Sequence, residues 1–355
     1  MALDFDPSDR RPFGNTGLRL PPIVFGGTSL GNLFRVVDDG EKSRIVDAWF
    51  DQVAPPLVID SAGKYGAGLS LEIIGQELQR RGVREDQVII SNKLAWRRVP
   101  LTGTEPTFEP GAWFGLDHDA VQDISHDGIL RCWEEGNALL APYRASLVSV
   151  HDPDEYLAAA DGKDDFTRRT EDIVGAYQAL ERLRDDGLVA GVGIGAKDWK
   201  SIRYLSNYCH FDWVMFANSY TLFSHPRSLS DWMHQLAHQG VGIINSALFH
   251  GGFLVGGNYF DYRLIQPSQP ADADKLAWRA KFWEVCDRHA TTPMEAAIAF
   301  GRRHPAVHAV AISSSRADRV ASHVQAVAQT SPVEFWNALQ AEGLLNEAAS
   351  SEPTA

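Results

Sequence analysis

PLVIDSAGKYGAGLSLEIIGQELQRRG (56–82) decides the fold class, because a strand-like run in it is followed by a helix-like run. Residues 56–61 form a short, nearly continuous apolar run, the pattern of a strand covered on both faces in a parallel sheet. Residues 69–82 carry apolar side chains three and four positions apart and stop at a glycine, as amphipathic helices commonly do. The stretch therefore predicts one β/α unit.

The same unit recurs along the whole chain. A strand followed by a helix, eight times over, predicts an α/β fold in which the strands close into a (β/α)8 TIM barrel. The strand-like runs are residues 21–27, 56–61, 87–93, 146–152, 189–195, 213–219, 241–247 and 307–313. Helical spacing of apolar residues is found at 41–53, 69–82, 170–187, 229–240 and 273–290.

A doubly wound open sheet is the alternative architecture. It uses the same alternation but normally places a glycine-rich phosphate loop after its first strand. GGTSLGN (26–32) matches such a loop weakly. GVGIGA (191–196) follows the fifth strand, and its glycines are spaced differently from those of the dinucleotide fingerprint. These departures favour the barrel.

Length and composition limit the remaining possibilities. No low-complexity linker divides the 355 residues, so we expect one domain over 1–355, ordered at about 11–346, with a flexible tail at 347–355. The 33 basic and 46 acidic residues give a net charge of −13, which disfavours nucleic acid and anionic membranes as partners. The start resembles no signal peptide, and no apolar run is long enough to span a membrane. We expect a cytoplasmic monomer or small homo-oligomer.

The three cysteines are the next constraint on function. Cys132, Cys209 and Cys286 lie far apart in the sequence, which excludes a close-spaced zinc motif and a disulfide framework. A metal hydrolase is an alternative because LDHDAVQDISHD (116–127) is rich in histidine and carboxylate. These ligands would come from one variable loop rather than from several rigid strand ends, so we expect no bound metal.

Two connections are longer than a barrel needs, at residues 95–125 and 249–273. Both leave the carboxyl ends of strands, which form the catalytic face of a TIM barrel, so they should wall a pocket for a small-molecule substrate. The first connection contributes the aromatic residues Trp96, Trp113 and Phe114. We expect these rings to contact the substrate, although loop aromatics also serve simply to anchor a loop.

Four residues that can carry chemistry follow three successive strands. Asp60 ends the second strand and Tyr65 follows it, Lys93 ends the third, and His151 ends the fourth. Hydride transfer to a carbonyl leaves an alkoxide that needs a proton, and a phenol of ordinary pKa, near 10, is a poor donor at neutral pH. We expect Lys93 to lower the pKa of Tyr65, Asp60 to hold Lys93, and His151 to orient the carbonyl oxygen.

DSAGKYG (60–66), SNK (91–93) and SVHD (149–152) resemble the catalytic tetrad segments of the aldo-keto reductase superfamily. RPFGNTGLRLPPIVFGGTSLG (11–31) resembles the amino-terminal hairpin that closes the barrel bottom in that family. The resemblance implies an oxidoreductase that uses NAD or NADP, with Asp60, Tyr65, Lys93 and His151 as its catalytic residues.

The resemblance also implies where the cofactor binds. The family binds phosphates with the loops after strands seven and eight, here 246–254 and 313–323, and Tyr220 is expected to stack on the nicotinamide. Ile194-Gly195 and Ser322-His323 replace residues common in relatives, which leaves the choice between NAD and NADP open. The implied cofactor-binding residues are Gly27, Thr28, Asp60, Gly195, Tyr220, Ser246, Leu248, Gly251, Ser314, Arg316, Arg319 and His323.

Within the superfamily, the stretch from 244 to 263 looks most like the branch of D-threo-aldose 1-dehydrogenase (L-fucose dehydrogenase), to which pyridoxal 4-dehydrogenase is related. That likeness implies oxidation of the C1 hydroxyl of an aldose to a lactone. An NADPH-dependent aldehyde or ketone reductase is an alternative, since Arg316 and Arg319 could bind a 2′-phosphate. A non-enzymatic cofactor-binding subunit is another, and the presence of all four tetrad residues argues against it.

Overall fold

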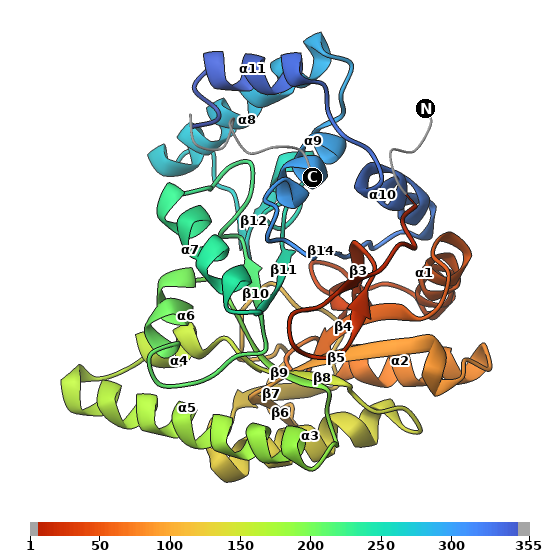
Figure 1. Ribbon diagram of the computed structural model, residues 1–355, viewed down its shortest axis with the longest axis vertical. Coiled ribbons are helices and arrows are strands. Elements are labelled where there is room, and N and C mark those ends of the chain that lie inside the picture. Colours follow the sequence, from red (N-terminus) through yellow and green to blue (C-terminus); the bar gives the residue numbers. More distant parts are fainter. Residues whose placement is uncertain (1–5, 347–355) are drawn as a thin grey trace.

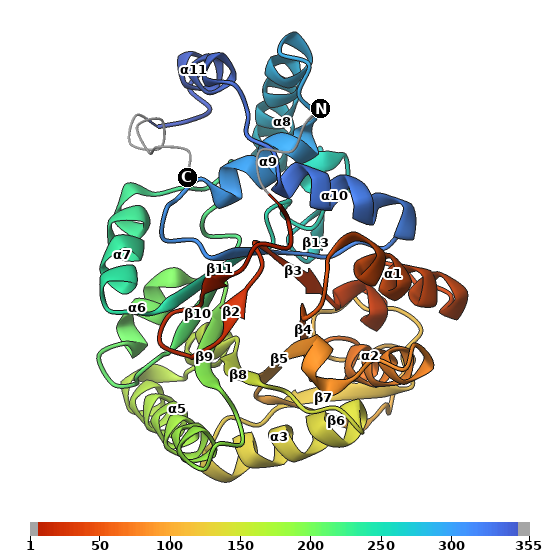
Figure 2. The same ribbon diagram turned by 45° about the vertical axis from the view of Figure 1, so that its right-hand side comes forward.

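The computed structural model describes residues 6–346, in which eight parallel strands form a closed barrel surrounded by helices (Figures 1 and 2). The last strand pairs with the first, with Val310 opposite Ile23, and this pairing closes the sheet. The barrel prediction is confirmed and the open sheet is excluded. The strands are β3 (Ile23–Gly26), β4 (Leu57–Ala62), β5 (Val88–Leu94), β8 (Leu147–His151), β9 (Gly191–Ala196), β10 (Trp213–Ala217), β11 (Gly242–Ser246) and β14 (Ala309–Ile312).

The helices form a ring around the strands, as Figure 2 shows. Side chains cap several of them: Asp38 accepts a hydrogen bond from the amide of Glu41, and Thr292 and Glu295 form a reciprocal capping box. The helices are α1 (Asp39–Gln52), α2 (Leu69–Arg80), α3 (His126–Leu140), α4 (Pro153–Ala158), α5 (Gly162–Asp185), α6 (Trp199–Leu205), α7 (Arg227–His238), α8 (Pro270–Arg288), α9 (Pro293–Arg302), α10 (Val320–Val327) and α11 (Val333–Ala341).

The apolar strand runs supply two separate clusters of buried side chains. The larger cluster packs strands against helices, and the smaller one fills the barrel interior. A hairpin of β1 (Arg11–Pro12) and β2 (Arg19–Leu20) contributes Phe13 and Leu20 to the interior cluster, with the ring of Phe13 6.2 Å from that of Trp213. The expected amino-terminal hairpin therefore plugs one end of the barrel and leaves the carboxyl ends of the strands for the site.

Both long connections contain short strands that the sequence pattern did not predict. In 95–125, β6 (Trp96–Pro100) pairs antiparallel with β7 (His118–Gln122), and in 249–273, β12 (Tyr259–Phe260) pairs with β13 (Arg263–Leu264). These strands are two to five residues long, which is too short for a clear alternating pattern.

The tail expected at 347–355 lies outside the described residues. Among residues 6–346, no helix combines the length and apolar character needed to cross a membrane. The one-domain organisation stays a prediction.

Candidate active site

The neighbouring strands β4 and β5 bring Asp60 and Lys93 together. Their parallel register places Asp60 opposite Ser91 and Ala62 opposite Lys93. The ammonium of Lys93 forms an ion pair with Asp60 and donates to the backbone oxygen of Ser61 at 3.1 Å, while the hydroxyl of Ser91 donates to the other oxygen of Asp60 at 3.0 Å. The buried carboxylate and ammonium thus neutralise each other at the strand ends.

Tyr65 and His151 complete the tetrad around this ion pair. Tyr65 sits on the turn after β4, where its amide donates to the oxygen of Ala62 at 3.0 Å. Lys93 Nζ lies 4.4 Å from the centroid of the Tyr65 ring, and the His151 ring meets that ring edge-on with centroids 5.7 Å apart. Gly195, opposite His151 on β9, leaves room for Lys93, because an added Cβ there would lie 3.0 Å from Lys93 Cδ.

The acid–base properties of Tyr65 differ from the sequence expectation. Burial, and then the negative charge of Asp60, raise the pKa of the phenol well above its ordinary value of 10. The expected lowering by Lys93 is wrong for the protein alone, because Asp60 cancels the charge of Lys93 and burial lowers the pKa of that ammonium. Tyr65 is therefore a protonated donor at neutral pH.

His151 is uncharged in its buried position. Burial lowers its pKa well below 6.5. The negative charge of Asp152 raises this pKa, and the positive charges of Lys93, Lys64 and Lys197 lower it. Nε2 lies 3.6 Å from Asp152 Oδ1, and Nδ1 has no hydrogen-bond partner in the described part of the chain. A proton on Nε2 would make the neutral ring a hydrogen-bond donor to a substrate oxygen.

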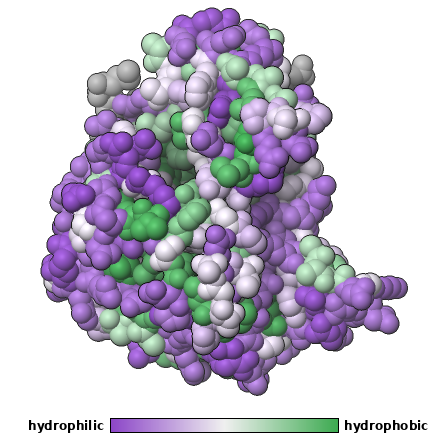
Figure 3. All heavy atoms as spheres, turned by 180° about the vertical axis from the view of Figure 1, so that it is seen from behind, coloured by the Kyte–Doolittle hydropathy of each residue, from purple (hydrophilic) through white to green (hydrophobic). Residues whose placement is uncertain are grey.

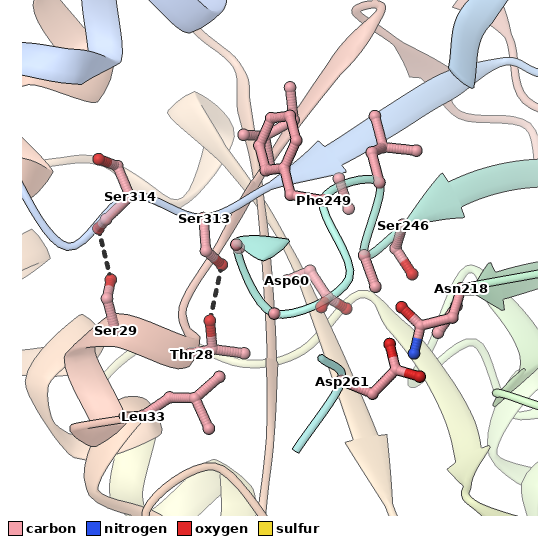
Figure 4. Close-up of a pocket in the computed structure, with 18 of the residues that line it drawn as sticks. Thr28, Ser29, Leu33, Asp60, Asn218, Ser246, Phe249, Asp261, Ser313 and Ser314 are labelled. Carbon is pink, nitrogen blue, oxygen red and sulfur yellow. Dashed lines mark hydrogen bonds between the residues drawn. The ribbon is translucent and has the colours of Figure 1, made fainter. Parts of the chain in front are cut away.

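The tetrad lies in a pocket with a volume of about 590 Å³ at the carboxyl ends of the strands. Thr28 donates to Ser313 at 2.9 Å and Ser29 to the backbone oxygen of Ser314 at 2.6 Å, which joins the first and last strand ends (Figure 4). The surface opposite to the view of Figure 1 is hollowed, with hydrophobic side chains around the hollow (Figure 3). The expected residues that line the pocket are Thr28, Asp60, Tyr65, Lys93, His151, Gly195, Ser246, Leu248, Gly251, Ser314, Arg319 and His323.

Three expected cofactor residues do not line this pocket within the described chain. Tyr220 is 1% exposed and stacks on Phe300 with centroids 5.1 Å apart, because β10 ends at Ala217 and Asn218 turns the chain with a φ of 60°. Gly27 donates its amide to the oxygen of Asp60. Arg316 is exposed and paired with Asp318. Stacking of Tyr220 on the nicotinamide is therefore not supported.

The three expected substrate aromatics lie behind or beside the pocket rather than among its lining side chains, as far as residues 6–346 show. Trp113 stacks on Tyr65 at 5.9 Å and donates its indole N–H to Glu109 at 2.8 Å. Trp96 lies under the ammonium of Lys64, 4.5 Å from it. Phe114 is 36% exposed. Trp113 and Trp96 thus contact residues of the site without lining the pocket.

Sequence reasoning missed Asn218 and Asp261, whose side chains face each other at the pocket (Figure 4). Asn218 Oδ1 is buried with no partner among the described residues, which suits an amide donor on a ligand. Asp261 is held by His250 Nδ1 at 2.9 Å, and His250 Nε2 contacts the hydroxyl of Thr221 at 2.7 Å. An asparagine directly after a strand, where it tolerates a left-handed conformation, was the available signal for Asn218.

Lysine and carboxylate side chains form a second ionic cluster beside His151. The carboxylates of Glu109, Asp152 and Glu155 lie within 4.8 Å of one another, and none of them belongs to the segment 116–127. Their cations are Lys64 and Lys197, which bind Glu155 at 3.0 and 2.5 Å. The two ammonium groups lie among these carboxylates and offset part of their negative charge.

The polar groups at the two ends of the pocket suit the two ends of a dinucleotide. One end offers the serines 313–315, Arg35, Arg319 and the start of α10, which suit phosphate groups. The other end offers the unpaired Asn218 oxygen beside the tetrad. The residues present therefore fit a nicotinamide dinucleotide bound between the two ends.

Comparison with known proteins agrees with this arrangement. The model of the Aldo/keto reductase family matches residues 22–342. The chain is 26% identical to pyridoxal 4-dehydrogenase of Microbacterium luteolum, covering 96% of this chain and 98% of that protein. It is also 26% identical to D-threo-aldose 1-dehydrogenase of a Pseudomonas species, covering 90% of this chain and 93% of the relative.

Solved structures share the fold at lower identity. A glycerol dehydrogenase from Gluconobacter oxydans matches with a TM-score of 0.68 and 15% identity, covering 94% of each chain. An aldo-keto reductase from Bacillus halodurans matches with a TM-score of 0.66 and 20% identity, covering 96% of this chain and 97% of the other.

Proposed function

Because this chain belongs to the aldo/keto reductase family of oxidoreductases, we propose that it is an NAD(P)-dependent dehydrogenase that oxidises the C1 hydroxyl of an L-fucose-like aldose to a lactone. The observation that carries the proposal is the convergence of Asp60, Tyr65, Lys93 and His151 at one end of a pocket whose other end suits phosphates. The two relatives that are 26% identical, named for an aldose and for pyridoxal, support a dehydrogenase.

The proposed reaction assigns one task to each member of the tetrad. The His151 imidazole donates a hydrogen bond to the C1 oxygen, and Tyr65, once it has lost its own proton to solvent, takes the C1 hydroxyl proton as the C1–H bond breaks. NAD or NADP, when bound, would supply the acceptor for the hydride and its two electrons. The C1–O bond then becomes the carbonyl of the lactone. Asp60 holds Lys93 by their ion pair, and the ammonium of Lys93 packs against the Tyr65 ring.

An initial-rate survey tests the proposal. NAD and NADP are each tried with L-fucose, D-arabinose, pyridoxal and simple aldehydes, in both directions. Cofactor reduction by an aldose, with a lactone as product, supports the aldose dehydrogenase. Turnover of aldehydes alone moves the chain to the reductase alternative, and silence with every pair contradicts an oxidoreductase acting on these substrates.

An aldehyde reductase is the second candidate, and the raised pKa of Tyr65 favours it. A phenol that stays protonated at neutral pH is ready to donate to the alkoxide formed in reduction.

The same shift predicts a pH dependence. Oxidation requires Tyr65 to lose its proton, and a pKa above 10 leaves little phenolate at neutral pH, so kcat/KM for oxidation should rise with pH across the neutral range. Reduction should stay nearly level over that range, because Tyr65 remains protonated. Rates measured in both directions across a pH series test this. An oxidation rate that falls as the pH rises would contradict the assignment of Tyr65.

The position of Arg319 leads to a prediction about the choice between NADP and NAD. It is the arginine of loop 313–323 that lines the pocket, whereas the exposed Arg316 is held by Asp318. If Arg319 binds a 2′-phosphate, Arg319→Ala should weaken NADP binding about 10- to 100-fold and leave NAD binding nearly unchanged. Arg316→Ala is the matched control, and titration of both cofactors gives the dissociation constants. Equal weakening of NAD and NADP would refute a 2′-phosphate contact.

A further inference from the structure

We propose that Lys64, the residue directly before Tyr65, is a positioning residue whose ion pair with Asp152 keeps His151 uncharged and its Nε2–H free for the substrate oxygen. The inference rests on the proposed function for the role of His151, and its electrostatic part can be measured without turnover.

The ammonium of Lys64 is buried among three carboxylates. It lies 2.6 Å from Asp152, 2.7 Å from Glu109 and 3.0 Å from Glu155, and its side chain is 2% exposed. It donates hydrogen bonds to Asp152 and Glu155 and forms a further ion pair with Glu109. Burial alone would lower the pKa of Lys64, but Asp152 and Glu109 raise it above its ordinary value, so the group is charged.

This bonding ties two catalytic strand ends together. Lys64 precedes Tyr65 on the turn after β4, and Asp152 follows His151 at the end of β8. Glu109, which also binds Lys64, accepts the indole N–H of Trp113. The ring of Trp113 in turn stacks on Tyr65. Lys64 therefore acts on both catalytic side chains through residues directly attached to them.

The cluster has an excess of negative charge, which the ammonium of Lys64 reduces. The cluster contains three carboxylates and two ammonium groups. The second ammonium is that of Lys197, which binds Glu109 at 3.1 Å and Glu155 at 2.5 Å. Without Lys64, three carboxylates would face one ammonium. Removing a single partner from a buried ion pair leaves a charge that attracts any available proton.

His151 is a neutral base beside this cluster that can take this proton, and Asp154 is a second buried group there, whose pKa burial and then Asp152 raise to about 6. The charged and titratable groups around it are Asp152, which favours the charged imidazole, Lys93, Lys64 and Lys197, which oppose it, and the protonated Tyr65. Asp152 Oδ1 lies 3.6 Å from His151 Nε2. A charged His151 would donate this N–H to Asp152, and the substrate oxygen would lose its donor.

The experiment follows His151 by NMR in protein labelled at histidine, with the signal assigned by its loss in His151→Asn. In Lys64→Met the pKa of His151 should rise by about one unit or more. The fall of kcat/KM at low pH should move upward by the same amount, with kcat affected more than KM. Lys64→Arg should restore both values, and the exposed Lys163→Met is the control that should change neither.

Asp152→Asn provides the test in the opposite direction and serves if Lys64→Met fails to fold. It should lower the pKa of His151, and the double variant Lys64→Met/Asp152→Asn should return it toward the wild-type value. A Lys64→Met protein that loses activity or stability with the His151 pKa unmoved would overturn the proposal, as would an Asp152→Asn protein with an unchanged or raised pKa. Inactivity of the wild type on every substrate would contradict the proposed function, while the titration would still decide the part played by Lys64.

Discussion

Tyr65→Phe is expected to reduce kcat about 10³-fold while leaving the affinity for the nicotinamide cofactor nearly unchanged, since a general acid or base contributes about 10²- to 10⁴-fold. The substitution removes the hydroxyl that exchanges a proton with the substrate. It keeps the ring that packs against Lys93, His151 and Trp113. Steady-state rates and a cofactor titration measure the two effects separately.

Tyr143→Phe is the matched control for this prediction. Tyr143 is a buried tyrosine outside the site, and its hydroxyl donates to the backbone oxygen of Val83 at 2.7 Å. Its loss should cost some stability and leave kcat near the wild-type value. If Tyr65→Phe retains turnover, the proton donor is another group and the tetrad assignment is wrong.

Lys93→Met is expected to lower the free energy of unfolding by about 3–5 kcal/mol and to abolish turnover, because it leaves Asp60 charged and buried without its partner. The double variant Asp60→Asn/Lys93→Met removes both charges and should recover most of the stability. Turnover should remain lost in the double variant, since the site still lacks the ammonium beside Tyr65.

Denaturant midpoints and activities of Lys93→Met, Asp60→Asn and the double variant separate the effect on stability from the effect on turnover. Recovery of stability without activity would show that the pair has a catalytic part beyond its structural one. Recovery of activity together with stability would contradict it, because Asp60 and Lys93 would then be needed only to hold the strand ends.

The barrel was predictable because each strand is buried on both faces and so reads as an apolar run. The predicted run 56–61 corresponds to β4 at Leu57–Ala62, and the run 87–93 to β5 at Val88–Leu94. The tetrad was found for a related reason: parallel strands bring their carboxyl ends to one face, so residues at those ends converge whatever their separation in sequence. The apolar runs locate the strand ends, and the strand ends in turn locate the tetrad.

The parts that sequence reasoning missed depend on backbone turns and on side chains from long loops. Tyr220 was expected in the pocket because segment 218–223 resembles the one whose aromatic residue stacks on the nicotinamide in relatives, but the left-handed Asn218 directs Tyr220 toward Phe300. Glu109 and Lys64 are 45 positions apart and meet only because the connection after β5 folds back. No periodic pattern marks such a meeting. The pKa of Tyr65 likewise depends on burial that residue types alone do not reveal.

Transfer of deuterium from C1-deuterated L-fucose to the nicotinamide ring tests the central claim most directly. The account predicts one deuterium in the reduced cofactor for each lactone formed, a slower rate than with the unlabelled sugar, and transfer about 10³-fold slower in Tyr65→Phe. Reduced cofactor without deuterium, or undiminished transfer in Tyr65→Phe, would contradict hydride transfer from C1 at this tetrad.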